Sequence, residues 1–340
     1  MSVTLNNNDP EVSVLMSCFN GSRWLHQSID SILAQSFTSF ELILINDGSS
    51  DDTWEIIESY RDIDCRVVAI NKNNTGLADS LNSGIFIAKG KWIARLDQDD
   101  LSESTRLEEQ VCFMLKHPNV VLLGSGFIEF EENNKVIKKH TYPSNHKELV
   151  KNLERSKRFF PHSSAFYKVE VVKQLGGYNK RIHRAEDRCL WLELASKGSI
   201  ACLPNPLVKI RKHADQMSLD EKGKSQLCDA ISVEVCYFLR KRGYEDPSND
   251  PDYNKWILFH KWVEDRILKL GILEKRNVWV IARKKFFSIE NKFIGIIYLL
   301  KVLITSGHLV TLLLEKYFGS FLSKKLAREW VVNNTKQNHF

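Results

Sequence analysis

The sequence predicts an α/β protein: an open, mostly parallel sheet flanked by helices, followed by a C-terminal region that is mainly helical. Three observations predict this. Short β-prone apolar runs alternate with helical segments between residues 11 and 100, as in parallel sheets with covering helices. Polar clusters follow these runs, where open α/β sheets bind their ligands. After about residue 219 the apolar spacing becomes helical and stays so.

The N-terminal elements follow one another closely. Each predicted strand is a buried-type run of Val, Ile and Leu, and each helix between them begins at a polar cluster that can cap it. The strands are VSVLMSC (12–18), ELILIND (41–47), RVVAINK (66–72) and KWIARLD (91–97), and the helices lie within 20–37, 53–60 and 77–90.

The second half of this region is more mixed. STRLEEQVCFML predicts a capped helix, and the segment 119–142 predicts strands around an ENNK turn. A strand and short helix within 159–178, a helix over 185–198 and a strand pair over 199–213 complete it. We therefore expect a catalytic domain over residues 1–218 and a helical, basic region over 219–340.

Composition narrows the class of protein. The 340 residues are 43% hydrophobic and 26% charged, which is typical of a globular chain. The seven Cys form no C-x-x-C pair, so we expect a reducing compartment rather than disulfides or zinc. The N-terminus has neither a basic segment nor a long apolar run and does not predict a signal peptide.

Asp97, Asp99 and Asp100 end a predicted strand with three carboxylates in four residues. No dinucleotide fingerprint or Walker A loop lies between a strand and a helix, which argues against NAD enzymes and P-loop NTPases. Carboxylates that share Mg²⁺ or Mn²⁺ with phosphates are another way to hold a nucleotide. The structural alternative is a helix start, where acids stabilise the helix dipole by ~0.3–1 kcal/mol each.

Context decides between these alternatives, because five blocks in order resemble the family 2 glycosyltransferases with the GT-A fold. The resemblance covers roughly residues 11–218. The blocks are VSVLMSCFNGSRWLHQSIDSILAQSF, ELILINDGSSDDT, NNTGLADSLNSGIFIAKGKWIARLDQDD, FPHSSAFYKVEVVKQLGGY and AEDRCLWLELASKG.

The resemblance implies a nucleotide-sugar site. Asp47 matches the acid that accepts the imide N–H of uracil, a task that suits an acceptor-only carboxylate. Asn46 stands where the family often has a first Asp. The residues implied in nucleotide-sugar binding are Asn20, Asp47, Gly76, Arg95 and Asp97.

The resemblance also implies a metal and a base. Asp99 and Asp97 match the D-x-D motif that binds Mn²⁺ or Mg²⁺, and His213 is a further candidate ligand. Asp187, with Glu186 beside it, matches the catalytic base of an inverting transfer. For both pairs of acids the alternative is helix-start charge.

His162 and Trp191 are acceptor-side candidates. A lone His is commonly a satisfied structural residue, and core packing is the simpler interpretation of Trp191. Arg95 and Arg211 are candidates for phosphate contact, with a solvated side chain as the alternative.

The C-terminal region is basic and apolar. From Lys261 onward it holds 15 Lys and Arg against 6 Asp and Glu, whereas the first 260 residues hold 33 against 36. The run 293–314 reaches spanning length, but Lys301 and His308 interrupt it, which favours amphipathic helices at a membrane surface. The alternative is a helical subdomain that packs on the core or forms a homodimer.

The expected function is therefore inverting transfer of a hexose of glucose or galactose type. The donor is a UDP-sugar and the acceptor a lipid-linked saccharide of an O-antigen or capsule. The protein would be cytoplasmic and peripheral on the inner face of the cytoplasmic membrane, with no nucleic-acid partner. Two alternatives stay open: a dTDP-rhamnose or GDP-sugar transferase of the same fold, and a non-catalytic scaffold recruited to membranes.

Overall fold

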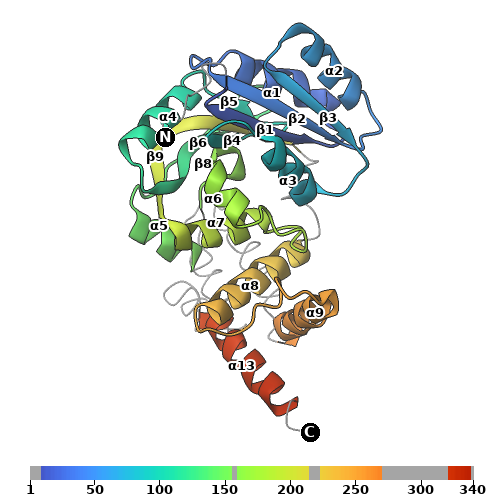
Figure 1. The fold of residues 1–340 in the computed structure, drawn as a ribbon, viewed down its shortest axis with the longest axis vertical. Coiled ribbons are helices and arrows are strands. Elements are labelled where there is room, and N and C mark those ends of the chain that lie inside the picture. The colour runs from blue at the N-terminus through green and yellow to red at the C-terminus, as the bar shows by residue number, and fades with distance from the viewer. Residues whose placement is uncertain (1–8, 155–158, 214–222, 270–320, 338–340) are drawn as a thin grey trace, which may run out of the picture. The chain divides into compact units, whose positions relative to one another are not determined.

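The computed structural model describes residues 9–154, 159–213, 223–269 and 321–337. The chain divides into two compact units, one formed by residues 1–153 and 158–220 and the other by 154–157 and 221–340. The first unit holds a large sheet with helices, and the described residues of the second form helices (Figure 1).

The first unit is built on one nine-stranded sheet with strand order β3-β2-β1-β4-β8-β6-β9-β5, and β7 pairs with β6. The half that comes first in the chain, β3-β2-β1-β4, is entirely parallel. In the other half β6 and β9 are parallel, whereas β8, β5 and β7 pair antiparallel with their neighbours. The strands are β1 Val12–Cys18, β2 Phe40–Asp47, β3 Val67–Lys72, β4 Trp92–Arg95, β5 Leu101–Ser102, β6 Val120–Glu131, β7 Val136–His140, β8 Phe166–Lys168 and β9 Ser199–Lys212.

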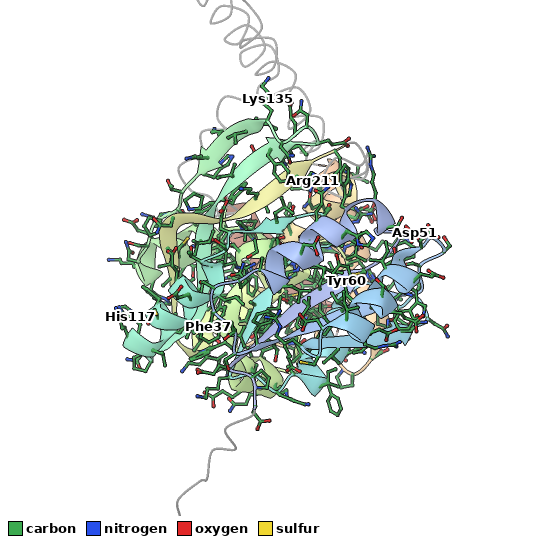
Figure 2. The ribbon with its side chains drawn as sticks, turned by 90° about the horizontal axis from the view of Figure 1, so that it is seen from above. Phe37, Asp51, Tyr60, His117, Lys135 and Arg211 are labelled. Atoms are coloured by element: carbon green, nitrogen blue, oxygen red, sulfur yellow. The ribbon has the colours of Figure 1, made fainter. Side chains whose placement is uncertain are left out.

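The helices of this unit connect strands and flank the sheet (Figure 1). Each buries a face spaced at three or four residues, as Leu25, Ile29 and Ile32 do on α1. Tyr60 of α2, labelled in Figure 2, donates to Asp30 of α1 at 2.6 Å and so joins two neighbouring helices. The helices of the first unit are α1 Ser22–Leu33, α2 Thr53–Ile63, α3 Leu77–Ile87, α4 Arg106–Lys116, α5 His146–Leu153, α6 Val169–Gln174 and α7 Glu186–Lys197, with the 3-10 turn η1 His162–Ser164.

The parallel register places three polar loops at one edge of the sheet. Cys18 at the end of β1 lies opposite Asn46 of β2, and Asp47 lies opposite Lys72 of β3. β1 and β2 are buried along almost their whole length, so the chain leaves the core at the same level in both strands. The predicted open α/β sheet with flanking helices is confirmed, and its antiparallel strands are confined to the second half.

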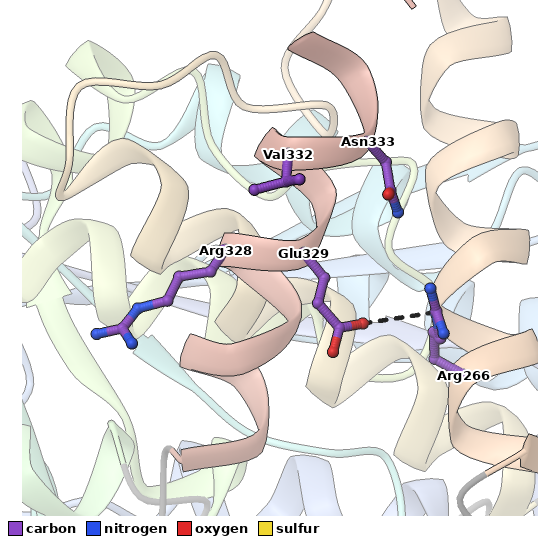
Figure 3. Close-up of a pocket in the computed structure, with 5 residues that line it drawn as sticks. All are labelled: Arg266, Arg328, Glu329, Val332 and Asn333. Atoms are coloured by element: carbon purple, nitrogen blue, oxygen red, sulfur yellow. Dashed lines mark ion pairs between the residues drawn. The ribbon is translucent and has the colours of Figure 1, made fainter. Parts of the chain in front are cut away.

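Within the part of the second unit that the structure describes, the helices are α8 Gly223–Arg240, α9 Tyr253–Lys269 and α13 Phe321–Gln337. Aromatic rings pack α9 on α13: the Trp330 ring lies 5.0 Å from Phe259 and 5.2 Å from Trp262. A shallow pocket between these helices contains the ion pair of Arg266 with Glu329 (Figure 3). The apolar run 293–314 lies outside the described residues. Among the helices that are described, none has the length and apolar character needed to cross a bilayer.

Candidate active site

The loop after β1 is tied to the loop after β2. Asn20 adopts a positive φ of 48°, and its side-chain oxygen accepts the Ser50 N–H at 2.8 Å. The backbone N–H of Asn20 donates to Ser49 Oγ at 3.0 Å. Asn20, predicted to contact the nucleotide sugar, thus holds two loops of the site together. The residue before α1 is Gly21, without a side-chain cap.

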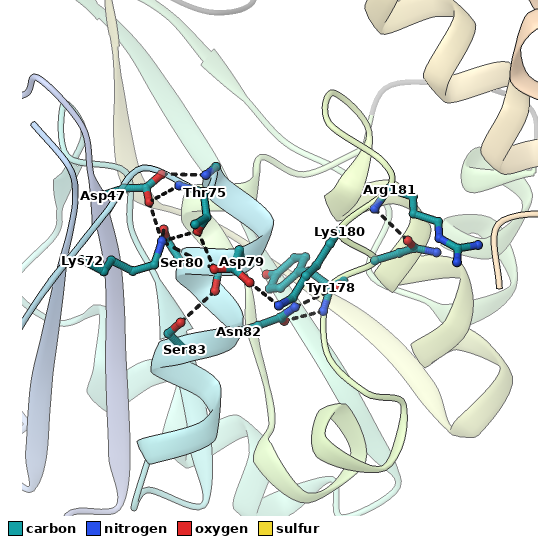
Figure 4. Close-up of polar contacts among 12 residues, drawn as sticks. Asp47, Lys72, Thr75, Asp79, Ser80, Asn82, Ser83, Tyr178, Lys180 and Arg181 are labelled. Carbon is teal, nitrogen blue, oxygen red and sulfur yellow. Dashed lines mark hydrogen bonds and ion pairs between the residues drawn. The ribbon is translucent and has the colours of Figure 1, made fainter. Parts of the chain in front are cut away.

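Asp47 lies at the end of β2, and both oxygens of its carboxylate accept hydrogen bonds (Figure 4). Oδ1 accepts hydrogen bonds from Lys72 Nζ at 2.5 Å and from the Thr75 N–H at 2.9 Å. Oδ2 accepts the Gly76 N–H at 2.9 Å. Burial alone would raise the pKa of Asp47, but these donors hold it below its ordinary value. The carboxylate is therefore ionised and fixed in direction.

Gly76 has a structural role that the Asn-x-Gly resemblance did not specify. Its φ is 92°, a conformation that favours glycine, and this geometry turns its N–H toward Asp47 just before α3 begins. The loop after β3 is thereby joined to the end of β2.

Helix α3 links this region to the loop that precedes α7 (Figure 4). The side-chain amide of Asn82 donates to the Tyr178 carbonyl at 2.8 Å and accepts the Tyr178 N–H at 2.7 Å. Asp79 forms an ion pair with Lys180, and this contact lowers the pKa of Asp79 to about 2. The segment leading to Glu186 and Asp187 is thus anchored to the helix that starts at Gly76.

Asp97, Asp99 and Asp100 follow β4 and gather their carboxylates in one place. One ligand atom of each lies within 4.8 Å of the others, a spacing that suits a single divalent ion. Burial and the neighbouring acids raise the pKa of Asp99, and that of Asp100 well above its usual range. Burial also acts on Asp97, but the Arg95 guanidinium keeps its pKa below the ordinary value.

Arg95 differs from its predicted role. Its side chain is only 2% exposed and forms an ion pair with Asp97, so it lies beneath the acids instead of facing a phosphate. Ser163, in η1, lies in the same buried region and contacts Arg95, Asp97 and Asp100.

His213 follows β9 and contacts the acid cluster, although it lies 114 residues after Asp99 in the chain. Its Nε2 lies 2.8 Å from Asp99 Oδ2, and its Nδ1 is buried with no hydrogen-bond partner among the described residues. Arg211, at the end of β9, donates its backbone N–H to Asp100 Oδ1 at 3.0 Å and its Nε–H to the Asp99 carbonyl at 3.0 Å. The structure therefore groups the predicted ligands Asp97 and Asp99 with Asp100, and it places the third predicted ligand, His213, beside Asp99.

Gln98, between the two acids of the D-x-D, was not singled out from the sequence. Its side-chain amide pairs with the backbone of Phe19: Oε1 accepts the N–H at 2.8 Å and Nε2 donates to the carbonyl at 3.0 Å. A Cβ on Gly21 would lie 2.2 Å from Gln98 Oε1, so glycine leaves the room that this contact needs. No sequence signal marks the middle residue of a D-x-D for such a role.

Glu186 and Asp187 begin α7. Burial and the adjacent Asp187 raise the pKa of Glu186 to about 8, and its Oε2 has no hydrogen-bond partner among the described residues. Burial likewise raises the pKa of Asp187, although its Oδ1 accepts the Arg188 N–H at 2.6 Å. A carboxylate whose pKa is raised is a stronger base once it is ionised.

The two acceptor-side candidates, His162 and Trp191, pack against each other, and His162 is half-buried whereas Trp191 is fully buried. Trp191 is 1% exposed, and its ring packs edge-on against His162 at 5.6 Å. His162 Nε2 hydrogen-bonds the Tyr178 hydroxyl at 2.7 Å, and burial, followed by the Arg95 charge, lowers the pKa of His162 well below its usual value. Core packing, the simpler interpretation of Trp191, fits this placement better than a platform for a sugar.

Comparison with known proteins identifies the family. The model of glycosyl transferase family 2 matches residues 13–176. The Bacillus subtilis (strain 168) protein EpsE, which carries the name of a glycosyltransferase, is 37% identical over 62% of this chain and 76% of its own. The chain belongs to glycosyltransferase family 2. The Escherichia coli O-antigen biosynthesis glycosyltransferase WbnJ is 34% identical over 68% of this chain and 90% of its own.

Solved structures agree on the fold. TarS of S. aureus, determined with UDP-GlcNAc, has a TM-score of 0.57 and 17% identity over 67% of this chain and 66% of that chain. The mannosyltransferase PcManGT of Pyrobaculum calidifontis, determined with GDP-Man and Mn²⁺, has a TM-score of 0.51 and 15% identity over 95% of this chain and 87% of that chain. The fold of this family 2 glycosyltransferase is accordingly GT-A.

Proposed function

We propose that this glycosyltransferase is metal-dependent and inverting. It moves a hexose of glucose or galactose type from a UDP-sugar to a lipid-linked saccharide in surface polysaccharide biosynthesis. The observation that carries the proposal is the cluster of Asp97, Asp99 and Asp100 at the sheet edge where the loops after β1 and β2 meet. The biosynthetic context is supported by a relative named for O-antigen biosynthesis and by AmsE of Erwinia amylovora, named for amylovoran biosynthesis.

The Asp47 carboxylate supports a UDP-sugar as the donor. Lys72 Nζ and the Thr75 N–H both donate to Oδ1, whereas the Gly76 N–H donates to Oδ2, so Oδ2 is the oxygen that would accept an imide N–H. Uracil and thymine both carry that donor, so a dTDP-sugar is the first alternative. A GDP-sugar is the second, because PcManGT was determined with GDP-Man.

The residues fit a hard divalent cation. Asp97, Asp99 and His213 would hold Mn²⁺ or Mg²⁺, with Asp100 fixed behind them by the Arg211 backbone. A cation bound there would act as a Lewis acid that neutralises the diphosphate leaving group. Arg95 would balance the charge on Asp97 from beneath.

Asp187 acts as the catalytic base. Its carboxylate takes the proton of the acceptor hydroxyl as that oxygen forms a bond to the anomeric carbon. The bond from this carbon to the diphosphate oxygen breaks on the opposite face, and the configuration inverts. Glu186 beside it stays protonated near neutral pH, which leaves the negative charge of the pair on Asp187.

The basic C-terminal region would bring the enzyme to the cytoplasmic face of the membrane, where a lipid-linked acceptor is available. About 1 kcal/mol per Lys or Arg near an anionic surface is a reasonable gain for such attachment. Packing against a second copy of the chain is the alternative use of this region.

One assay tests the proposal. Purified protein is incubated with Mn²⁺, a synthetic GlcNAc-diphosphate-lipid and a panel of UDP-, dTDP- and GDP-sugars, and products are identified by mass spectrometry. We expect product from a UDP-hexose, none with EDTA, and none from the Asp187→Asn variant. Product from a dTDP- or GDP-sugar alone would overturn the donor assignment. Lack of product together with lack of Mn²⁺-dependent UDP binding would favour the non-catalytic scaffold.

A further inference from the structure

The hydroxyl of Ser163 lies at the centre of the charged groups beneath the acid cluster. The residue is fully buried. Its Oγ lies 2.7 Å from Asp97 Oδ2 and 2.5 Å from Asp100 Oδ2, and it accepts from Arg95 Nη1 at 3.2 Å and from the Asp97 N–H at 3.3 Å. One small side chain therefore contacts both acids that flank Asp99, as well as their buried counter-charge.

This position addresses a physical problem in the cluster. Three carboxylates within 4.8 Å of one another repel, and each is free to rotate about its Cβ–Cγ bond unless something fixes it. The Ser163 hydroxyl has a single proton and donates to one of Asp97 and Asp100 at a time, but its Oγ lies within 2.7 Å of both and so ties the positions of the two carboxylates to one atom. Arg95 supplies charge to Asp97, but Ser163 is the group that spans both acids.

The turn that carries Ser163 is itself held rigidly. The Ser164 N–H donates to the Pro161 carbonyl at 3.0 Å and the Ala165 N–H to the His162 carbonyl at 3.0 Å, which closes η1. Ser164 is equally buried, but its hydroxyl donates to the Pro161 carbonyl at 2.9 Å and accepts from the Ser125 N–H of β6 at 3.3 Å. The two neighbouring serines thus serve different parts of the fold.

We propose that Ser163 is a positioning residue of the metal site, which sets the separation and direction of the Asp97 and Asp100 carboxylates without touching substrate. The proposal rests on the metal-dependent function proposed above. Partners that orient metal ligands in this way typically contribute 10–100-fold to metal affinity. The sequence carries no signal for this role of Ser163, whereas its neighbour His162 was a site candidate from the same block.

The test compares Ser163→Ala with Ser164→Ala. Mn²⁺ affinity is measured in the presence of UDP by electron paramagnetic resonance of the free ion, and thermal unfolding is followed by circular dichroism. We expect Ser163→Ala to weaken Mn²⁺ binding by about 10-fold or more. Ser164→Ala should lower Tm and leave Mn²⁺ affinity at the wild-type value. Transfer activity of Ser163→Ala should recover as Mn²⁺ is raised, so that the Mn²⁺ concentration for half-maximal rate shifts and kcat is largely kept.

A third variant keeps the test decisive if Ser163→Ala does not fold. Ser163→Cys preserves the volume and offers a weaker donor, so its Mn²⁺ affinity should lie between wild type and a full loss. Equal Mn²⁺ affinity of wild type and the folded Ser163 variants would overturn the proposal and leave the metal site standing. Absence of Mn²⁺ binding in the wild-type protein would instead overturn the proposed metal site, so the two failures are distinguishable.

Discussion

His213 Nε2 lies 2.8 Å from Asp99 Oδ2, although 114 residues separate them in the chain. Asp99 follows β4 and His213 follows β9, and the contact engages Asp99, whereas Ser163 contacts Asp97 and Asp100. An imidazole nitrogen next to a carboxylate is a pair of ligands suited to Mn²⁺. This relationship leads to the first prediction.

His213→Ala should weaken Mn²⁺ binding in the presence of UDP by about 10–100-fold, because it removes either a ligand or the group that orients Asp99. Asp99→Asn should weaken it further, since a negative charge is lost as well. Calorimetric titration of Mn²⁺ into the UDP-bound protein measures both. His117→Ala, at the exposed end of α4 (Figure 2), is the matched control and should bind Mn²⁺ like wild type. A His213→Ala variant with unchanged affinity would place His213 outside the metal site.

Gln98→Ala should raise the KM for the donor by roughly 5–30-fold, as expected from the loss of about 1–2 kcal/mol when two hydrogen bonds to the Phe19 backbone are removed. The reason is that the loop after β1 would no longer be held against the D-x-D turn. Steady-state kinetics with varied donor give the value.

The matched control for Gln98 is Gln35→Ala. The side chain of Gln35 also makes two hydrogen bonds to the backbone, at 2.9 and 2.7 Å to the carbonyls of Ser31 and Glu103, but Gln35 is buried and lies beyond the other end of α1. Its loss should lower Tm without a change in donor KM. If both variants changed KM equally, the effect of Gln98 would be one of general stability.

Asp187→Asn should reduce kcat by about 10²–10⁴-fold, the range for removal of a general base. Burial raises the pKa of Asp187, so the wild-type rate should fall on acidification at a higher pH than an ordinary aspartate would give. The sign follows because only the ionised form accepts the proton. A pH–rate profile of wild type and variant checks this, and an identical acidic limb in the residual activity of Asp187→Asn would assign that limb to another group.

Glu186→Gln should stabilise the protein at alkaline pH. The pKa of Glu186 is raised to about 8 by burial and by Asp187, from an unfolded value near 4.5. Because folding raises the pKa of this carboxyl group, its contribution to the free energy of unfolding is fully present below pH 4.5. That contribution is lost progressively as the pH rises to about 8. Glutamine stays neutral throughout, so the Tm of the variant should exceed that of wild type at pH 8.5 and differ little at pH 5, by about 2–4 °C for each kcal/mol. A Tm difference independent of pH would contradict the assignment.

The sequence anticipated the architecture because local patterns encode it. Runs such as ELILIND specify buried strands by composition, and the polar cluster after each run marks the point where the chain leaves the core. The GT-A fold and family 2 membership that the five blocks implied are both confirmed. The antiparallel insertion of β8 between β4 and β6 was not anticipated, since strand order depends on long-range packing that no local pattern records.

The residue types of the candidate site are likewise encoded in local motifs, but the contacts that hold these residues in place are not. Sequence motifs were enough to select Asp47, Asp97, Asp99 and Asp187 as site candidates, because carboxylates in this order and context are typical of few kinds of site. Arg95 shows the limit: it was a candidate for phosphate contact, and its burial beside Asp97 decides otherwise. Trp191 was an acceptor-side candidate with core packing as the simpler interpretation, and its burial fits core packing.

By itself, then, the sequence determined the strands, the acids that end them and the order of the motifs, because these depend on residue type and short-range spacing. Tertiary structure alone decided which residues hydrogen-bond to one another across the site. Gln98 bonds to the Phe19 backbone and Asn82 to the Tyr178 backbone. Ser163 contacts both Asp97 and Asp100. Those contacts join residues 63 to 96 positions apart. Only the completed sheet brings such residues within hydrogen-bonding distance, and short polar side chains carry no sequence signal of the partner they will meet.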